Sequence, residues 1–263
     1  MTAVSLSADR LQAYLRASAG RTRETSLLFP FALFFHRTDP LPFFSHAAPI
    51  DPAPSRKLRG ALAAVRAAFA RAGRRARFEY LEAFAPDLPP ALEAAGFVPE
   101  ARQTVMACSC DATGAVSQVP GVVIERLLPS SSIDRAREFL RTQRLGFDPE
   151  DLRAVSDREA VVFLGELFEQ AAFLARLDGE PAGAAMTTPC IDALTELVGL
   201  ATLPPFRRRG IGTALAAAAM AAAVGRAEAV VLSAEDEGAE RLYARLGFRP
   251  VGALLSFADP TRA

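Results

Sequence analysis

The apolar and polar residues in the second half of the chain alternate between strand-like and helical patterns. The predicted order is one strand, two helices, three strands, a helix, a strand, a helix and a last strand. Two of the strands flank Asp178-Gly179, a dipeptide typical of a tight β-hairpin turn. The predicted strands include Val122–Leu128, Ala172–Leu177, Pro181–Thr187, Leu194–Leu203 and Ala229–Ser233, and the predicted helices include Ile133–Arg144, Asp157–Gln170 and Ala214–Val224.

The first half of the chain mixes the same two patterns less regularly. Leu6–Ala19 has helical spacing, with Ser7 as its N-cap. Thr25–His36 is predicted as one buried strand interrupted at Pro30, and the Pro-rich stretch Asp39–Pro54 as a loop. The elements predicted after this loop are a helix from Leu58, a strand at Ala76–Glu82, a helix at Leu88–Phe97 and a strand at Arg102–Cys108.

Two features of this half carry side chains with possible chemical roles. Phe43 and Phe44 either pack inward or line the entrance of a substrate site. Cys108 and Cys110 lie on one predicted strand, but no further pair of Cys or His residues is nearby in the sequence. We therefore expect these two thiols to pack in the core and not to bind a metal.

The stretch that organises the second half is a glycine-containing junction between a strand and an Ala-rich helix. It reads Arg207-x-x-Gly210-x-Gly212 and leads into the helix at Ala214. The first N–H groups of a helix have no partner within it, and the helix dipole favours anions there. A junction of this kind therefore predicts a pyrophosphate site. The stretch is not a P-loop, because that motif needs Lys followed by Ser or Thr after its last glycine. It also lacks the dinucleotide-binding fingerprint, which needs a small residue where this chain has Leu215.

The junction resembles the acetyl-CoA signature of the GNAT superfamily of acyl-CoA-dependent N-acyltransferases. A second motif of this family resembles Asp236-x-x-Ala239-x-x-Leu242-Tyr243-x-x-x-Gly247-Phe248, one helix and one strand further along. Asp236 stands where Asn is usual in the family, and Asp also caps the start of a helix well. The resemblance implies an α/β fold of mixed α+β type, with a mostly antiparallel central sheet flanked by helices.

The resemblance also implies where acetyl-CoA, as a co-substrate, would bind. The pantetheine amides would pair with the strand end at Ala201, Thr202 and Leu203, where the following Pro204-Pro205 cannot continue a ladder. Asp236 and Ala239 are the candidate residues from the second motif. The candidate residues for the pyrophosphate are Arg207, Arg208, Arg209, Gly210, Ile211, Gly212 and Thr213.

The reaction implied by the resemblance is the direct attack of an amine on an acyl thioester. Tyr243 is the candidate donor to the leaving thiolate; the alternative is a tyrosine that only packs on its helix face. Glu196 is the candidate base, because strand alternation would place it with Val198, Leu200 and Thr202 on one face. An exposed acid at a strand end is the alternative for Glu196, and water could replace a dedicated base.

Composition narrows the choice of partners and compartment. The chain has 263 residues, a formal net charge of +0 and 51% hydrophobic residues, so no basic field indicates nucleic acid. Three Cys residues argue against a disulfide framework and fit a reducing cytoplasm. We expect no membrane segment, no metal and a small-molecule amine acceptor in preference to a protein. The sequence does not indicate the oligomeric state.

The two halves are predicted to be related domains. Ala91–Phe97 and Tyr243–Phe248 both end a helix on Gly-Phe before a strand, although ordinary α/β alternation would also give this likeness. We predict a degenerate GNAT-like domain at residues 1–115 and a catalytic GNAT N-acetyltransferase domain at residues 120–263. A non-catalytic acyl-CoA-binding sensor on the same fold is the alternative function.

Overall fold

The computed structural model describes residues 6–37, 44–52, 58–110 and 119–260. The described residues divide into two compact units. The N-terminal unit comprises residues up to 105 together with 233–236 and 250–260, and the C-terminal unit comprises residues 106–232 and 237–249. The last strand of the chain is thus grouped with the first half of the sequence.

The C-terminal unit is built on five strands in the order β10-β9-β8-β7-β6. Neighbouring strands are antiparallel except β9 and β10, which are parallel. The predicted element order of this half is therefore confirmed. Its strands are β6 (Val122–Leu127), β7 (Ala171–Leu177), β8 (Glu180–Thr187), β9 (Leu194–Thr202) and β10 (Ala229–Ala234), and its helices are α4 (Ile133–Phe147), α5 (Asp157–Glu166), α6 (Ile211–Ala223) and α7 (Glu237–Arg245).

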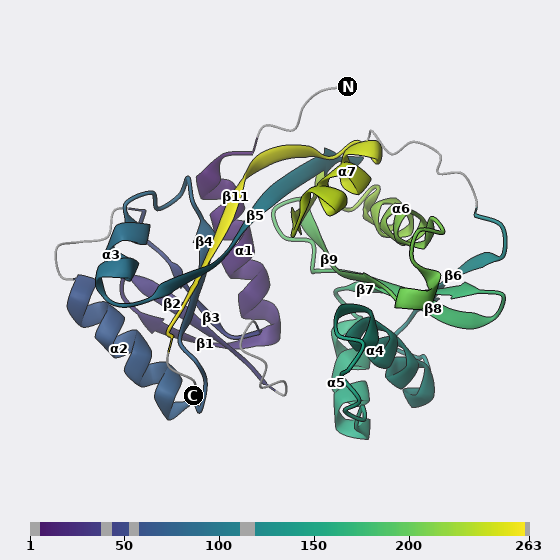
Figure 1. Cartoon of the computed structure of the whole chain (residues 1–263), viewed down its shortest axis with the longest axis horizontal. Helices are drawn as coiled ribbons and strands as arrows, with labels where there is room; N and C mark the ends of the chain where they lie inside the picture. The colour runs from purple at the N-terminus through teal and green to yellow at the C-terminus, as the bar shows by residue number, and fades with distance from the viewer. Residues whose placement is uncertain (1–5, 38–43, 53–57, 111–118, 261–263) are drawn as a thin grey trace. The chain divides into compact units, whose positions relative to one another are not determined.

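Helices cover both faces of this sheet (Figure 1). On the face covered by α4 and α5, Phe139 stacks on Phe163 with ring centroids 4.9 Å apart, over a core that includes Ala184 of β8. On the other face, Gly183 of β8 lies against Ile211 and Leu215 of α6. Burying apolar residues on both faces is what fixes the register of these strands.

Local signals explain most boundaries in this unit. Asp178 and Gly179 both have positive φ, 52° and 89°, as the predicted two-residue hairpin turn requires. Ser132 and Ser156 cap α4 and α5 through their side chains. Helix α5 ends at Glu166, earlier than the predicted Gln170.

The N-terminal unit carries six strands in the order β1-β2-β3-β4-β11-β5. Phe34 of β2 packs with Ala19 of α1, whereas the neighbouring Phe35 faces Phe69 of α2. The strands are β1 (Arg23–Leu28), β2 (Phe31–His36), β3 (His46–Pro49), β4 (Arg77–Leu81), β5 (Val98–Ser109) and β11 (Arg249–Ala258), and the helices are α1 (Ala8–Thr22), α2 (Leu58–Arg71) and α3 (Leu88–Ala94).

Two predictions for this unit were wrong. The stretch Thr25–His36 forms two antiparallel strands, and β1 at the sheet edge is largely exposed, not buried. The stretch Asp39–Pro54 is not all loop, because it contains the buried strand β3. Phe43 lies outside the described residues, and Phe44 lies with its ring centroid 5.1 Å from that of His36.

The N-terminal unit also buries several titratable side chains. Burial lowers the pKa of His46 to about 4, so its imidazole is neutral near neutral pH. Arg77, which is largely buried, donates to Glu79, Glu100 and Ser256. Cys108 and Cys110, which are grouped with the C-terminal unit, are both buried, in line with the prediction that they pack in the core.

Candidate functional site

Strand β9 contains a bulge three residues before its end. Its pairing with β8 shifts between Ala184, opposite Ala201, and Met186, opposite Val198. Gly199 adopts a positive φ of 60° at this point, and its carbonyl accepts a hydrogen bond of 3.0 Å from Gln143 Nε2 of α4. A Cβ at Gly199 would lie 2.2 Å from that nitrogen. The bulge therefore requires glycine, and α4 holds its carbonyl in place.

The bulge changes which residues of β9 share a face. Ala184 and Met186 lie on one face of β8, so their partners Ala201 and Val198 share the face covered by α4, and Glu196 lies two residues from Val198 on the same face. Thr202 pairs with Gly183 on the opposite face, against α6. The prediction that Glu196, Val198, Leu200 and Thr202 share one face was therefore wrong, because the bulge inserts one extra residue.

The pairing between β9 and β10 covers only the beginning of β9. Leu194, Thr195 and Glu196 lie opposite Ala229, Val230 and Val231, and the register ends there, although both strands lie wholly within the described residues. β9 continues to Thr202. One backbone edge of β9 is thus without a β10 partner along its last six residues, as a strand that accepts an added extended ligand requires.

Glu196 lies where the two strands part. Its backbone N–H donates to Thr188 Oγ1 at 2.9 Å. Its carbonyl accepts from the N–H of Thr188 at 2.9 Å, and its side chain is half-buried. These backbone contacts hold the Cα of Glu196 in place at the opening.

The segment after β9 turns away from the sheet as its two prolines predict. Pro204–Phe206 forms a 3₁₀ turn, after the Leu203 N–H donates to the Ala182 carbonyl at 2.9 Å. Arg207 then braces the turn: its Nε donates to the Thr202 carbonyl at 3.1 Å and its Nη2 to the Gly146 carbonyl at 3.0 Å. The guanidinium of Arg207 therefore joins the end of β9 to the last turn of α4.

Arg208 and Arg209 are exposed. Unlike Arg207, neither makes a hydrogen bond or ion pair through its side chain within the described part of the chain. Arg208 has a positive φ of 65°, which turns the backbone into α6. Two solvated guanidinium groups therefore stand beside the N-terminus of α6.

Helix α6 begins without a side-chain cap. Gly210 is its N-cap, with a φ of 80°, and no side chain caps the helix. The first hydrogen bond within the helix runs from the Ala214 N–H to the Gly210 carbonyl at 3.0 Å. The N–H groups of Ile211, Gly212 and Thr213 consequently have no partner within the helix. This end of α6 has the geometry and the dipole of an anion site.

Gly210 and Gly212 differ in what their surroundings require: Gly210 has a backbone conformation that favours glycine, whereas Gly212 lies where three elements meet. A Cβ at Gly210 would lie 3.0 Å from Val119 Cγ2, in a backbone conformation that L-residues rarely adopt. A Cβ at Gly212 would lie 3.5 Å from side-chain carbons of Leu200 and Leu242. The first turn of α6, the end of β9 and helix α7 therefore meet at Gly212.

Tyr243 follows Leu242 on α7 and is 9% exposed. Its ring packs edge-on against Phe248 with centroids 5.8 Å apart, and its carbonyl accepts from the Phe248 N–H at 3.1 Å. Ala239 is half-buried on the same helix. Asp236 is exposed immediately before α7 and is grouped with the N-terminal unit. Of the second motif, the structure thus brings Leu242 to the first turn of α6.

Sequence reasoning missed Gln143, Gly146, Gly199 and Val119, although an isolated glycine inside a strand pattern is a known signal of a bulge. Gly146 packs so closely on β9 that a Cβ there would lie 2.6 Å from Ala201 Cβ. Among the described residues, no group of three or more His, Cys, Asp or Glu is arranged to hold a metal. None of the described helices is long and apolar enough to cross a membrane.

Comparisons with known proteins agree with this geometry. Residues 135–248 match the model of the acetyltransferase (GNAT) family. A GCN5-related N-acetyltransferase from Kribbella flavida is 26% identical with a TM-score of 0.78, covering 98% of this chain and 97% of that one. A comparison with curated proteins gave no match.

Two further solved structures are similar in fold. A tandem GNAT protein from the clavulanic acid biosynthesis pathway is 15% identical with a TM-score of 0.59, covering 87% of this chain and 77% of its own. A GCN5-related N-acetyltransferase from Sphaerobacter thermophilus is 16% identical with a TM-score of 0.63, covering 87% and 76%. Residues 135–248 of this chain therefore form a domain of the GNAT acetyltransferase family, which supports acyl transfer as the class of reaction.

Proposed function

We propose that this protein transfers an acetyl group from acetyl-CoA to the amine of a small-molecule acceptor. The observation that carries the proposal is the uncapped start of α6 at Gly210, beside the end of β9 that has no β10 partner. One feature suits the pyrophosphate of coenzyme A and the other suits the amides of its pantetheine arm.

The residues present fit the co-substrate. The N–H groups from Arg208 to Thr213 would bind the pyrophosphate, and the Gly210 position is one that a Cβ would crowd. The backbone at Ala201, Thr202 and Leu203 would pair with the pantetheine amides, and Asp236 and Ala239 are the further candidates that the second motif supplies. The exposed Arg208 and Arg209 supply positive charge for the remaining phosphate, whereas Arg207 serves as a brace between β9 and α4.

The proposed chemistry is a direct transfer. The amine nitrogen attacks the thioester carbonyl carbon, the carbon–sulfur bond breaks, and the sulfur leaves as a thiolate. Tyr243 donates its hydroxyl proton to that thiolate. Glu196, on the α4 face where β9 and β10 separate, takes the proton that the amine loses, directly or through water.

The N-terminal half is proposed to be a degenerate GNAT-like domain at residues 1–115, with the catalytic domain at residues 120–263. The fold shared with a tandem GNAT protein over 87% of this chain supports a second GNAT-like half. The sequence around α2 carries no Arg-x-x-Gly-x-Gly pattern, so this half would bind no second acetyl-CoA.

The experiment that tests this function follows the release of the coenzyme A thiol with a panel of small primary amines. We expect release above hydrolysis with at least one amine. Tyr243→Phe should lower turnover about 100-fold or more, because it removes the proton donor. It should leave acetyl-CoA affinity unchanged, because it keeps the ring that packs on Phe248. Acetyl-CoA binding without turnover on any amine would favour the sensor alternative, and full turnover in Tyr243→Phe would exclude its proposed role.

A further inference from the structure

A cavity of about 670 Å³ lies between α4 and the loop that follows it, apart from the site described above. One wall of the cavity is a stripe of α4 that includes Glu138, Arg141 and Leu145. The opposite wall is the loop after α4 and includes Leu152 and Val155. The residues of α4 that contact β9, Gln143 and Gly146, lie on a different side of the helix. The volume is in the range of small-molecule sites.

The loop that forms the outer wall is held by its own hydrogen bonds. Asp151 accepts from the Arg153 N–H at 3.1 Å and from the Arg153 guanidinium at 2.8 and 2.6 Å. The Asp151 N–H in turn donates to the Asp148 carbonyl at 3.1 Å. The Arg153 hydrogen bonds hold the pKa of Asp151 at about 2, so this carboxylate stays ionised. These local hydrogen bonds therefore fix the shape of this wall of the cavity.

Each acidic side chain that lines the cavity has an arginine partner of its own. Asp134 pairs with Arg137 at 2.9 Å, and Asp151 pairs with Arg153 at 2.6 Å. Glu138 accepts from both Arg135 and Arg176. Burial alone would raise the pKa of Glu138, but the hydrogen bonds from these arginines outweigh burial and lower it.

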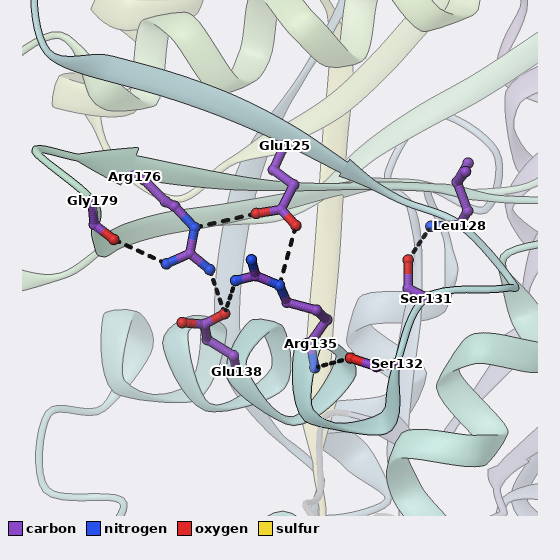
Figure 2. Close-up of polar contacts among 8 residues, drawn as sticks. All are labelled: Glu125, Leu128, Ser131, Ser132, Arg135, Glu138, Arg176 and Gly179. Atoms are coloured by element: carbon purple, nitrogen blue, oxygen red, sulfur yellow. Dashed lines mark hydrogen bonds and ion pairs between the residues drawn. The ribbon is translucent and has the colours of Figure 1, made fainter.

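Figure 2 shows how Glu138 is enclosed by these arginines. Arg135 and Arg176 both also reach Glu125, at 3.4 and 3.2 Å, so four side chains of alternating charge form one closed network. This network neutralises itself and anchors α4 to β6 and β7. Glu138 is therefore paired, as are the other two acidic residues of the cavity, Asp134 and Asp151.

Among the arginines that line the cavity, Arg141 differs from the others because it has no acidic partner among the described residues. Within the described ranges, the structure records no hydrogen bond or ion pair for its guanidinium, and it is exposed. The same cavity is lined by apolar side chains from both walls, including Leu145, Val155 and Leu152, and Leu152 is 84% exposed. A cavity lined by an exposed leucine and by an arginine without an acidic partner offers one apolar and one charged contact to the same ligand.

We propose that this cavity binds a small organic carboxylate that carries a short apolar group. One uncompensated guanidinium matches one carboxylate, which it can bind with two parallel hydrogen bonds. A phosphate dianion would need a second cation, and the other lining arginines are already paired. The leucine and valine side chains receive the apolar group.

The test is an NMR titration of the whole protein with hexanoate, which resolves weak binding and locates it by amide shifts. We expect saturable shifts in residues 134–155. Arg141→Gln should weaken the affinity about ten-fold or more, as expected for the loss of a charge-assisted pair. Arg158→Gln is the matched control, because Arg158 is an exposed arginine on α5 that does not line the cavity. It should leave the affinity unchanged.

Further titrations separate charge from apolar contact and from the acyl-CoA site. Hexanol and inorganic phosphate should each bind at least ten-fold more weakly than hexanoate, and Leu152→Ser should weaken hexanoate binding. Gly210→Ala should leave the affinity for hexanoate unchanged. The test of the cavity is therefore independent of whether the proposed acetyl-CoA site at α6 is correct. The proposal is overturned by an absence of saturable shifts at 134–155, by equal loss in Arg158→Gln, or by hexanol or phosphate binding as well as hexanoate.

Discussion

The starts of α5 and α6 differ in how they treat the first N–H groups of the helix, which have no partner within it. At α5, the Ser156 side chain accepts from the Glu159 N–H while the Glu159 carboxylate accepts from the Ser156 N–H, so the exposed donors are used within the protein. At α6, Gly210 has no side chain, and the first N–H groups stay available. The first arrangement stabilises the fold, and we propose that the second leaves the same donors for an anion.

Helix α6 forms without a cap because other terms offset the loss. Six of its side chains are buried against the sheet and its neighbours, and its sequence is dominated by Ala, the strongest helix former. Helix α5 is shorter and carries Gly165 near its end, so it gains more from its capping box. The comparison teaches that strong helix propensity and burial let α6 form with its first N–H groups uncapped, which is what the proposed anion site requires.

Filling the α6 start should have the largest effect. Gly210→Ala adds a Cβ 3.0 Å from Val119 in a backbone conformation with a φ of 80°, next to the proposed pyrophosphate site. We expect acetyl-CoA affinity to fall about ten-fold or more, measured by calorimetric titration.

The matched control lies just beyond the other end of the same helix. Gly225→Ala introduces the same backbone strain, about 1–2 kcal/mol, because Gly225 has a φ of 74°, but a Cβ there meets nothing within 4 Å. It should lower the free energy of unfolding and leave acetyl-CoA affinity intact. An equal loss of affinity in both variants would mean that Gly210 acts only through stability.

The support of β9 by α4 should have a smaller effect. Gln143→Glu keeps the side-chain size but removes the amide donor to the Gly199 carbonyl. The loss of about 1 kcal/mol of bulge stabilisation should weaken acetyl-CoA binding several-fold. Calorimetric titration checks this, and an unchanged affinity would show that the bulge holds its shape without α4.

Removing a cap that serves the fold should leave the ligand site alone. Ser156→Ala removes the acceptor for the Glu159 N–H and should lower the free energy of unfolding by about 1 kcal/mol in urea titrations. Acetyl-CoA affinity should not change. A loss of affinity without a loss of stability would break the division between the two kinds of helix start.

The two helix starts should also differ in their response to acid. Burial raises the pKa of Glu159, but hydrogen bonds from Ser156 and Arg144 outweigh burial and hold that pKa below its usual value of 4.5. The stability that this carboxylate contributes is therefore present above pH 4.5 and is lost as the pH falls through its lowered pKa. The α6 start has no titrating cap.

Urea unfolding between pH 3 and pH 7 measures this smallest effect. The difference in free energy of unfolding between the wild type and Glu159→Gln should shrink as the pH falls from about 4.5 through the lowered pKa of Glu159, because its carboxyl group then becomes uncharged, as the Gln side chain is. A difference that stays constant over this range would show that the charge of Glu159 is not what stabilises α5.

The order of elements in the C-terminal half could be predicted because each has its own periodicity and end signals. Asp178-Gly179 fixes a turn through local backbone preference, and Ser7 caps α1 as predicted. Strand β3 was missed because His46–Pro49 has only four residues and none is β-branched. Its burial comes from neighbouring strands, which local sequence does not show.

The candidate site was predictable in its backbone and less so in its side chains. Gly210 and Gly212 could be placed from motif spacing. The faces of Glu196 and Thr202 could not, because a bulge at Gly199 reverses the alternation, and the bulge depends on a contact from Gln143, 56 residues earlier. A contact over that distance leaves no trace in local periodicity.

The most direct test of the central claim is a calorimetric titration of the protein with acetyl-CoA, desulfo-CoA and NAD. The account predicts saturable micromolar binding of acetyl-CoA, retained with desulfo-CoA because the pyrophosphate and pantetheine are unchanged, and no binding of NAD. The absence of binding by both coenzyme A ligands would contradict it, and so would binding of NAD with equal affinity.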